Sequence, residues 1–418
     1  MTKKRLVKKF KNFFIVDGYS GANQFAPIVA KRYPNVSVFH VQSKKPIPSV
    51  YVNSFRSSDY IRNFVYDGNI DRLVRDLSSL SGESIVVAGI ESGVQLADTL
   101  SERLSSKTNG AELSGARRNK FEMYERVTKF NVSTGKIQRI DSVANIPKID
   151  FFPCVVKPTE SAGSDGIFIC DNPDEALRAT KSLLGKVNKL GIKNDSLVAQ
   201  QFIGGLEYAV NSVSFDGENC YSTIWEYHKV VSQTGAPIYD WERLVPFNSE
   251  EAQKLAAAHD IVTKALGIKW GASHGEYKLY NDTAILIEVA SRIDGIANAK
   301  LENEITTQGQ IQMGLDCYLD SMTSYRREFQ IKMNARNIAL INCSGTRILT
   351  SEVRKFVKSL PSYIGDQLRE PKSGEQRVTT DIFSSPGFIF LAHKDEKQIV
   401  HDHLAIREAE KSGKFSVS

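Results

Sequence analysis

The segment from His274 to Gly295, HGEYKLYNDTAILIEVASRIDG, constrains the fold more than any other part of the sequence. Two arms of alternating apolar and polar residues flank Asn281-Asp282. A short polar turn between two alternating arms is a strong signal for an antiparallel β-hairpin. The segment therefore predicts two long strands that pair with each other.

The register of this hairpin decides whether two glutamates face each other. A three-residue loop pairs Tyr280 with Ala284 and places Glu276 directly opposite Glu288. Like charges in that arrangement destabilise a sheet by roughly 0.2 to 1 kcal/mol unless a cation lies between them. Hard divalent ions prefer oxygen ligands, so magnesium, or alternatively manganese, is the natural occupant. A two-residue loop instead puts the glutamates on opposite faces and leaves one as a solvated surface charge.

An arginine follows this hairpin closely. Arg292 comes four residues after Glu288, just past the expected end of the strand, and Gly295 comes three residues later. A guanidinium suits an oxyanion or a transferring phosphoryl group, because its charge is permanent and its donors are forked. Glycine lets the backbone come close to a ligand. On its own Arg292 would be interpreted as a surface charge, but beside two metal carboxylates it becomes a catalytic candidate.

A second polar loop lies upstream, in VVKPTESAGSDG from Val155 to Gly166. Lys157 ends an expected strand and precedes a loop rich in serine and glycine, which offers a cation and unhindered backbone N–H groups for polyphosphate. The loop lacks the GxxxxGK[ST] pattern of a Walker A motif. Taken singly it is an ordinary hairpin connection. Lys120, in an expected helix, is either a second nucleotide contact or an exposed lysine.

The stretch from Val198 to Asn211, VAQQFIGGLEYAVN, predicts two strands joined at Gly204-Gly205. The main chain of residues 200–203 has the extended form that can hydrogen-bond an adenine edge, and Glu207 can accept from ribose hydroxyls. The alternative is a plain hairpin with a glutamate at its edge.

Short apolar strands alternate with amphipathic helices in the first hundred residues, which predicts a parallel α/β layer. The expected strands are 13–16, 36–41 and 85–90, and the expected helices are 22–32 and 93–104. Ligands gather at the carboxyl ends of such strands, here 17–21 and 89–93. These segments do not spell GxGxxG, so a nicotinamide cofactor is not expected.

The pattern changes along the chain and suggests three domains. Residues 1–115 form the N-terminal α/β domain. Residues 116–325 form a central α+β domain whose lid subdomain covers about 150–205. Residues 326–418 form a small C-terminal α/β unit, with a strand at 339–342. The full expectation is therefore a mixed α/β and α+β protein.

Charge and cysteine content exclude several classes of protein. The 418 residues carry a formal net charge of +6, and much of the excess lies in the first eleven residues. That leader is interpreted as a solvated terminus, with nucleic acid or an acidic membrane as alternatives. No apolar run matches a secretory signal of about 7 to 15 residues or a membrane span of about 18 to 20. Five cysteines without a CxxC pair fit a reducing cytoplasm.

The order of these motifs matters more than any single one. RNKFEM, VVKP, SAGSDG, QQFIGGLEY, HGEYKL and IEVASRIDG, between 118 and 295, together resemble the ATP-grasp superfamily. VVAGIESGVQLADTLSERL, RRNKFEMYE and AIREAEKSGKF look like its L-amino-acid ligase branch, which joins two amino acids into a dipeptide. The resemblance implies a Rossmann-like N-terminal domain, two subdomains that close over ATP, and small-molecule amino acids as partners. Nucleic acid and membrane are not expected as partners, and a homodimer is left open.

The resemblance also implies roles for individual residues. Phosphates of ATP would contact Lys120 and Lys157, and the mobile lid would be Ser161, Ala162, Gly163, Ser164 and Gly166. Adenine would meet Gln200, Gln201, Phe202 and Ile203, ribose Glu207, and magnesium Glu276 and Glu288. Arg292 and the Gly295 backbone would hold the acyl phosphate and the tetrahedral intermediate. Two departures are Ala290, where many members have asparagine, and Gln201, where the hinge is often acidic.

The implied reaction activates one carboxylate as an acyl phosphate, which the amine of a second substrate then attacks. Glu226 and His228 are expected to bind the first amino group or manage protons, although both can equally be structural. Further substrate contacts are expected at Tyr239 and Asp240, which are expected to lie in a loop, and at Arg292, Ile296 and Asp381. A carboxylate there would favour a basic first amino acid such as arginine. The alternative is a ligase or carboxylase that acts on a carboxylate other than an amino acid.

Overall fold

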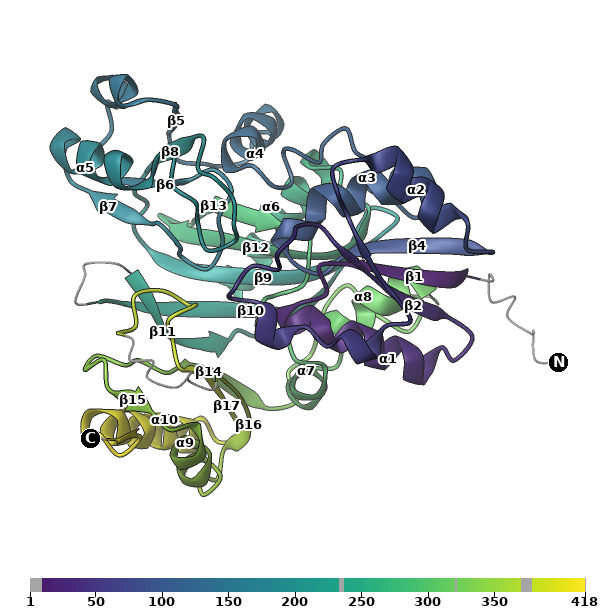
Figure 1. The fold of residues 1–418 in the computed structure, drawn as a ribbon. Helices are drawn as coiled ribbons and strands as arrows, with labels where there is room; N and C mark the ends of the chain where they lie inside the picture. Colours follow the sequence, from purple (N-terminus) through teal and green to yellow (C-terminus); the bar gives the residue numbers. More distant parts are fainter. Residues whose placement is uncertain (1–9, 233–236, 320–321, 370–377, 418) are drawn as a thin grey trace.

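The computed structural model describes residues 10–232, 237–319, 322–369 and 378–417. Lys3, Lys4, Arg5, Lys8 and Lys9 of the basic leader lie outside these residues. Three larger sheets and one two-stranded sheet organise the described chain, with the N-terminal layer, the smaller antiparallel sheet and the C-terminal helices at its periphery (Figure 1). The predicted mixture of parallel α/β and antiparallel α+β structure is confirmed.

The N-terminal layer is a four-stranded parallel sheet with the strand order β3-β2-β1-β4. Its strands are β1 (Phe10–Val16), β2 (Ser37–Gln42), β3 (Asn63–Val65) and β4 (Glu83–Ala88), and its helices are α1 (Phe25–Arg32), α2 (Ile70–Ser78) and α3 (Val94–Leu104). Alternate residues of β1 belong to two different hydrophobic cores, one on each face of the sheet. Phe13 and Ile15 pack with α1 and α8, whereas Phe14 and Val16 pack with α2 and α3. Helices cover both faces, which explains why residues 13–16 of β1 are a continuous apolar run.

A smaller antiparallel sheet, in the order β5-β8-β6-β7, contains most of the segment predicted as the lid, and we call it the lid sheet. Its elements are β5 (Ile137–Ile140), β6 (Cys154–Pro158), β7 (Phe168–Cys170), β8 (Leu197–Gln201) and α5 (Pro173–Leu183). Asn172 caps α5 by accepting from the N–H of Glu175, and Pro173 is its first residue, as the Asn-Pro signal predicts. The edge strand β5 lies before residue 150, so this sheet begins earlier along the chain than the lid predicted from the sequence.

The central sheet has eight strands in the order β13-β12-β9-β10-β11-β14-β17-β16. These are β9 (Leu206–Phe215), β10 (Glu218–Val231), β11 (Pro237–Leu244), β12 (Trp270–Tyr280), β13 (Thr283–Ala290), β14 (Asn334–Ala339), β16 (Tyr363–Leu368) and β17 (Gly387–His393). Tyr239 and Asp240 therefore lie in a strand, not in the loop predicted for them. The strand predicted at 339–342 is β14 and ends where the prediction began.

The C-terminal unit continues the central sheet, because β14, β16 and β17 are three of its eight strands. Helix α10 packs on β14 and β17. The remaining helices are α4 (Lys120–Val127), α6 (Glu250–Ala265), α7 (Ala299–Ile305), α8 (Gln310–Leu319), α9 (Thr350–Val357) and α10 (Glu396–Lys411). Short elements are β15 (Arg347–Ile348), β18 (Ser416–Val417), η1 (Ser20–Gln24), η2 (Val52–Ser54), η3 (Ser57–Asp59), η4 (Glu91–Gly93), η5 (Thr128–Phe130) and η6 (Val143–Lys148).

Candidate active site

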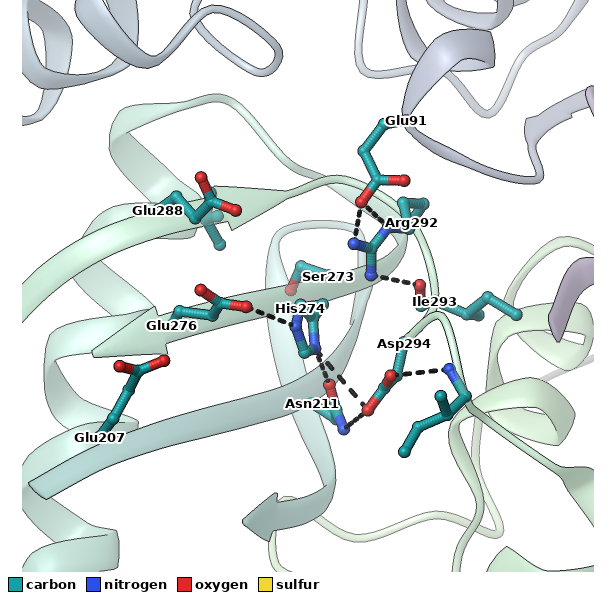
Figure 2. Close-up of polar contacts among 12 residues, drawn as sticks. Glu91, Glu207, Asn211, Ser273, His274, Glu276, Glu288, Arg292, Ile293 and Asp294 are labelled. Carbon is teal, nitrogen blue, oxygen red and sulfur yellow. Dashed lines mark hydrogen bonds and ion pairs between the residues drawn. The ribbon is translucent and has the colours of Figure 1, made fainter. Parts of the chain in front are cut away.

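The two glutamates of the β12–β13 hairpin do face each other. Glu276 pairs directly with Glu288, and Figure 2 shows both side chains, with Glu207 of the neighbouring strand β9, on the same side of the sheet. The loop prediction behind this pairing was wrong, because Tyr280 pairs with Thr283 across a two-residue turn.

A β-bulge reconciles the short loop with the pairing. Tyr277 pairs with Leu286, and the next pair is Glu276 with Glu288, so Ile287 is an extra residue on β13. A bulge reverses the face on which the following side chains lie. The carbonyls of Leu286 and Ile287 both accept hydrogen bonds from the Tyr124 hydroxyl, at 2.7 and 3.1 Å. The bulge therefore places Glu288 on the face of Glu276.

Two buried lysines surround Glu288. The Lys120 Nζ lies 3.0 Å from Glu288 Oε2 and also donates to the Ser161 carbonyl at 3.2 Å. Burial opposes the ionisation of Glu288, but the charges of Lys120 and Lys157 outweigh it and lower its pKa to about 2. Burial lowers the pKa of Lys157 to about 8, although Glu288 favours its charged form. The site therefore holds a carboxylate and two buried lysines, whose charges solvent screens only weakly.

The carboxylate pair fits magnesium only if phosphate and water supply the remaining ligands. Within the described ranges, no three His, Cys, Asp or Glu side chains form a group that could hold a metal. Magnesium usually takes one or two carboxylates together with phosphate oxygens and water, which matches Glu276 and Glu288 beside lysines suited to phosphate. The His274 Nε2 lies 3.5 Å from Glu276 Oε1, and its Nδ1 lies 2.7 Å from Asn211 Oδ1. His274 thus orients the Glu276 carboxylate, and Asn211 in turn orients His274.

Arg292 is held by a glutamate that sequence reasoning missed. Its Nε donates to Glu91 Oε1 at 2.7 Å, and its Nη1 donates to the Ile293 carbonyl at 2.6 Å (Figure 2). Glu91 begins η4 at the carboxyl end of β4, within the segment where the sequence predicts ligands. A side chain at Gly295 would meet nothing within 4 Å, so the space beside its backbone is open. Arg292 and Gly295 therefore lie where the sequence places them, past the end of β13.

The predicted phosphate loop is packed against the C-terminal segment. Gly163, Ser164 and Gly166 have positive φ angles of 65°, 64° and 74°. A methyl group at Gly163 would come within 2.3 Å of the Ile382 side chain, so glycine is required there both for the backbone angle and for the contact. The Ile382 N–H also donates to the Gly163 carbonyl at 3.3 Å. The loop is thus held against the C-terminal segment by its contacts with Ile382.

Asp381 belongs to this docking surface. Its carboxylate is paired with Lys189 of the lid and accepts from Ser384. Ala162 and Leu190 of the lid pack against Tyr51 in the same apolar cluster as Phe383. The expectation that Asp381 contacts substrate is therefore not supported, because a lid lysine already occupies its carboxylate.

The predicted adenine hinge has one free donor. The N–H groups of Gln201 and Phe202 bond the carbonyls of Lys136 and Pro153 at 2.8 and 3.0 Å, whereas the Ile203 N–H bonds no other backbone group of the described chain. The side-chain amide of Gln200 donates to the Tyr124 hydroxyl.

Glu207, the candidate ribose contact, is held by Lys229 at 2.5 Å and Lys278 at 3.3 Å. Burial opposes its ionisation, but these two cations lower its pKa below the ordinary value. Glu207 therefore lies near the hinge as a charged hydrogen-bond acceptor.

Three predicted residues lie on the opposite face of the central sheet. Side chains alternate between faces along a strand, so Glu226 and His228 point away from Lys229, which contacts Glu207. Glu226 pairs with Arg243 at 2.6 Å, His228 stacks on Trp241 at 3.6 Å, and Asp240 pairs with Arg407 at 2.5 Å. The catalytic and substrate roles expected for Glu226, His228 and Asp240 are not supported by this placement.

Two other substrate candidates remain on the side of the glutamates. The Lys229 Nζ lies 4.5 Å from the centre of the Tyr239 ring, which places this ring beside Glu207. The Ile296 N–H donates to Asp294 Oδ1 at 3.0 Å, directly after Gly295. The sequence analysis did not identify Asn211, His274 and Asp294 as site residues. These three residues contact one another across the strands β9 and β12 and the segment after β13, so no local pattern reveals them.

Known proteins share this fold and sequence. A family model described as ATP-grasp domain matches residues 150–300. Dapdiamide A synthase of Enterobacter agglomerans is 30% identical over 409 residues, which cover 95% of each chain. An L-amino acid ligase structure from Bacillus licheniformis has a TM-score of 0.76 at 18% identity, over 96% of this chain and 98% of that one. An ADP complex of the N5-carboxyaminoimidazole ribonucleotide synthetase purK has a TM-score of 0.69 at 13% identity, over 97% and 98%.

The chain therefore belongs to the ATP-grasp superfamily, in its L-amino-acid ligase branch. It is an ATP-dependent ligase that forms a C–N bond between a carboxylate and an amine. The family resemblance in the sequence is thus confirmed. In the described part of the chain, every helix is too short or too polar to cross a bilayer.

Proposed function

We propose that this ligase joins the carboxyl group of one L-amino acid to the amino group of a second, through an acyl phosphate. The observation that carries the proposal is the pairing of Glu276 with Glu288 beside Lys120 and Lys157, with Arg292 beyond the end of the same hairpin. This grouping offers ligands for a metal and a triphosphate next to a cation for the reacting carboxylate.

ATP binds between the lid sheet and the central sheet. Lys120 and Lys157 contact its phosphates, and the free N–H of Ile203 reaches the adenine edge. Glu276 and Glu288 would hold magnesium, with manganese as an alternative, and the bound ion would supply positive charge that neutralises phosphate. The backbone N–H groups of 161–166 cover the phosphates.

The first carboxylate attacks the γ-phosphorus of ATP, so that a new P–O bond forms and the bond to ADP breaks. Arg292 stabilises the negative charge on the reacting groups, and Glu91 fixes the guanidinium in position. The second substrate's amine then attacks the acyl carbon, and phosphate leaves. The lid seals against Tyr51 and Phe383 and keeps water from the acyl phosphate.

A basic first amino acid is not part of this proposal. That expectation rested on free carboxylates at Asp240 and Asp381, and both are paired with cations of the protein. The relative named dapdiamide A synthase and the L-amino acid ligase structure support amino-acid or amide-forming substrates. A homodimer and a cytoplasmic location stay predictions from the sequence.

A screen of phosphate release tests the proposed function. Purified enzyme, ATP and magnesium are mixed with single amino acids and with all pairs, and the products are identified by mass. Release that requires two amino acids, with a matching dipeptide, is the expected result. Release only with carboxylates other than amino acids would favour the alternative substrate class. No release with any amino acid pair would contradict the proposed function.

Glu288→Gln tests the metal site within the same assay. The variant keeps the shape of the side chain but removes the charge, so turnover should fall by at least about 100-fold, because each charged group acting on the transition state contributes about 10²–10³. Asp282→Asn in the same hairpin is the matched control, since its side chain is 78% exposed and its ion pair is at the surface. Full activity in Glu288→Gln would refute the metal role.

A further inference from the structure

Two adjacent arginines before α4 are both buried, but only one is satisfied by the protein. Arg117 is 1% exposed and donates to Asp98 at 3.0 Å, to the Leu266 carbonyl at 2.9 Å and to the Gly110 carbonyl. All of its nitrogens therefore have partners, including a carboxylate. Its role is to join the N-terminal layer to the central domain.

Arg118 is 6% exposed and has a different environment. Its Nη1 reaches the Ser161 carbonyl at 3.5 Å, the outer limit of a hydrogen bond, and its Nη2 has no partner in the described chain. No carboxylate of the described residues forms an ion pair with it. Removing a charge from water costs several kcal/mol unless a counter-charge is present. A buried guanidinium of this kind is consistent with a site for an anion supplied from outside the protein.

The position of Arg118 indicates which anion this is. The Ser161 carbonyl that it approaches also accepts from Lys120, which is paired with Glu288. Glu91, which holds Arg292, is near enough for the charge of Arg118 to act on it. Burial opposes the ionisation of Glu91, and the charges of Arg292 and, more weakly, Arg118 lower its pKa below the ordinary value. Arg118 therefore shares a backbone carbonyl with Lys120, the proposed phosphate contact, and lies near the Glu91–Arg292 pair proposed for the reacting carboxylate.

We propose that Arg118 binds the phosphoryl group while it passes from ATP to the substrate carboxylate. The inference rests on the proposed function, because it assigns a residue to the first step of that reaction. As the carboxylate oxygen bonds to phosphorus and the bond to ADP breaks, charge spreads over the three equatorial oxygens of the phosphoryl group. The free Nη2 of Arg118 donates to one of these oxygens. A guanidinium suits this task, because its charge is permanent and its donors are fixed in a plane.

The test separates the first step from the second by using hydroxylamine in place of the second amino acid. Hydroxylamine traps the acyl phosphate as a hydroxamate, so its rate reports phosphoryl transfer without the natural amine. Arg118→Met should lower the rate of hydroxamate formation by about 10²–10³, the usual effect of losing one donor to a developing oxyanion. The KM for the second amino acid should change less than threefold in the residual dipeptide reaction.

Thermal unfolding distinguishes this role from a structural one. Arg118→Met removes an uncompensated charge, so its melting temperature should equal or exceed that of the wild type. Arg117→Met is the matched comparison and should melt several degrees lower, because it leaves Asp98 buried without its cation. If Arg118→Met melts as low as Arg117→Met, the inference is overturned.

Two kinetic results would also overturn it. One is wild-type hydroxamate formation in Arg118→Met together with a raised KM for the second amino acid, which would assign Arg118 to the carboxylate of that substrate. The other is a wild-type rate in Arg118→Gln, the neutral variant to use if the methionine variant does not fold. Failure of the proposed function looks different, since the wild-type enzyme itself would then form no hydroxamate with any amino acid.

Discussion

Lys157 gives the proposed nucleotide site a pH dependence that an ordinary lysine would lack. Burial lowers its pKa from 10.5 to about 8, and Glu288 opposes this shift only in part. The free enzyme therefore loses this charge as the pH rises through about 8. If the triphosphate binds only the charged lysine, ATP can bind above pH 8 only when Lys157 takes up a proton. The affinity for ATP must therefore fall above that pH.

The magnitude follows from the pKa. The apparent Kd for ATP scales as one plus the ratio of neutral to charged Lys157. Between pH 7.5 and pH 9.5 this factor rises roughly 25-fold, which corresponds to about 2 kcal/mol of binding free energy. Phosphate groups titrate near pH 6, so the ionisation of the nucleotide stays nearly constant over this range. A lysine with its ordinary pKa would give almost no change.

Calorimetric titration with a non-hydrolysable ATP analogue and magnesium, at four values between pH 7.5 and 9.5, measures this effect. Lys157→Arg is the control, because arginine keeps its charge throughout the range. Its Kd should vary less than threefold even if its affinity is lower overall. Equal slopes for the two proteins would refute the reasoning, since another group would then be titrating, and a flat wild-type profile would do the same.

Two further predictions concern buried acids. Burial raises the pKa of Glu302 to about 7, so between pH 4.5 and 7 the folded state binds more protons than the unfolded state and the free energy of unfolding falls as the pH rises. Urea unfolding should show Glu302→Gln losing this slope, at most about 1.4 kcal/mol per pH unit; an unchanged slope would assign it elsewhere. Lys189→Ala unpairs Asp381 from the lid, so the ratio of ADP to coupled product should at least double as water enters. A ratio of one in this variant would contradict a role of the ion pair in closure.

Much of the fold follows from local patterns in the sequence. The strand predicted to follow Gly204-Gly205 is β9, and α6 begins after Ser249, whose hydroxyl accepts from the Ala252 N–H. Alternation and helix caps involve residues within a few positions of each other, so one segment carries the whole signal. The ends of β14, in contrast, are set by its pairing with β11 and β17. No local feature of the sequence marks them.

The candidate site was less predictable, because bulges and long-range ion pairs decide which polar residues face it. The turn signal was present, since Asn281 and Asp282 both have positive φ, as a two-residue hairpin turn requires. In β11 a second irregularity adds Asp240 between the pairs His228–Trp241 and Lys229–Tyr239.

Asp240, on the face of the central sheet opposite the glutamates, pairs with a residue that lies far away in the sequence. Asp240 is paired with Arg407, 167 residues later. A polar residue in a strand has the same appearance in the sequence whether it faces a ligand or a distant arginine. The roles of Glu226, His228 and Asp240 were therefore beyond a reading of local patterns.

The bulge at Ile287 is best explained by the charges around it. A regular two-residue hairpin would turn Glu288 to the other face and leave Lys120 and Lys157, 5% and 4% exposed, without this counter-ion. Breaking a buried ion pair costs about 3–5 kcal/mol, whereas one lost ladder hydrogen bond costs about 0.5–1.5 kcal/mol. The bulged register is therefore the more stable one even before a metal binds. The two lysines that the site uses for phosphate also fix the position of the carboxylate proposed for the metal.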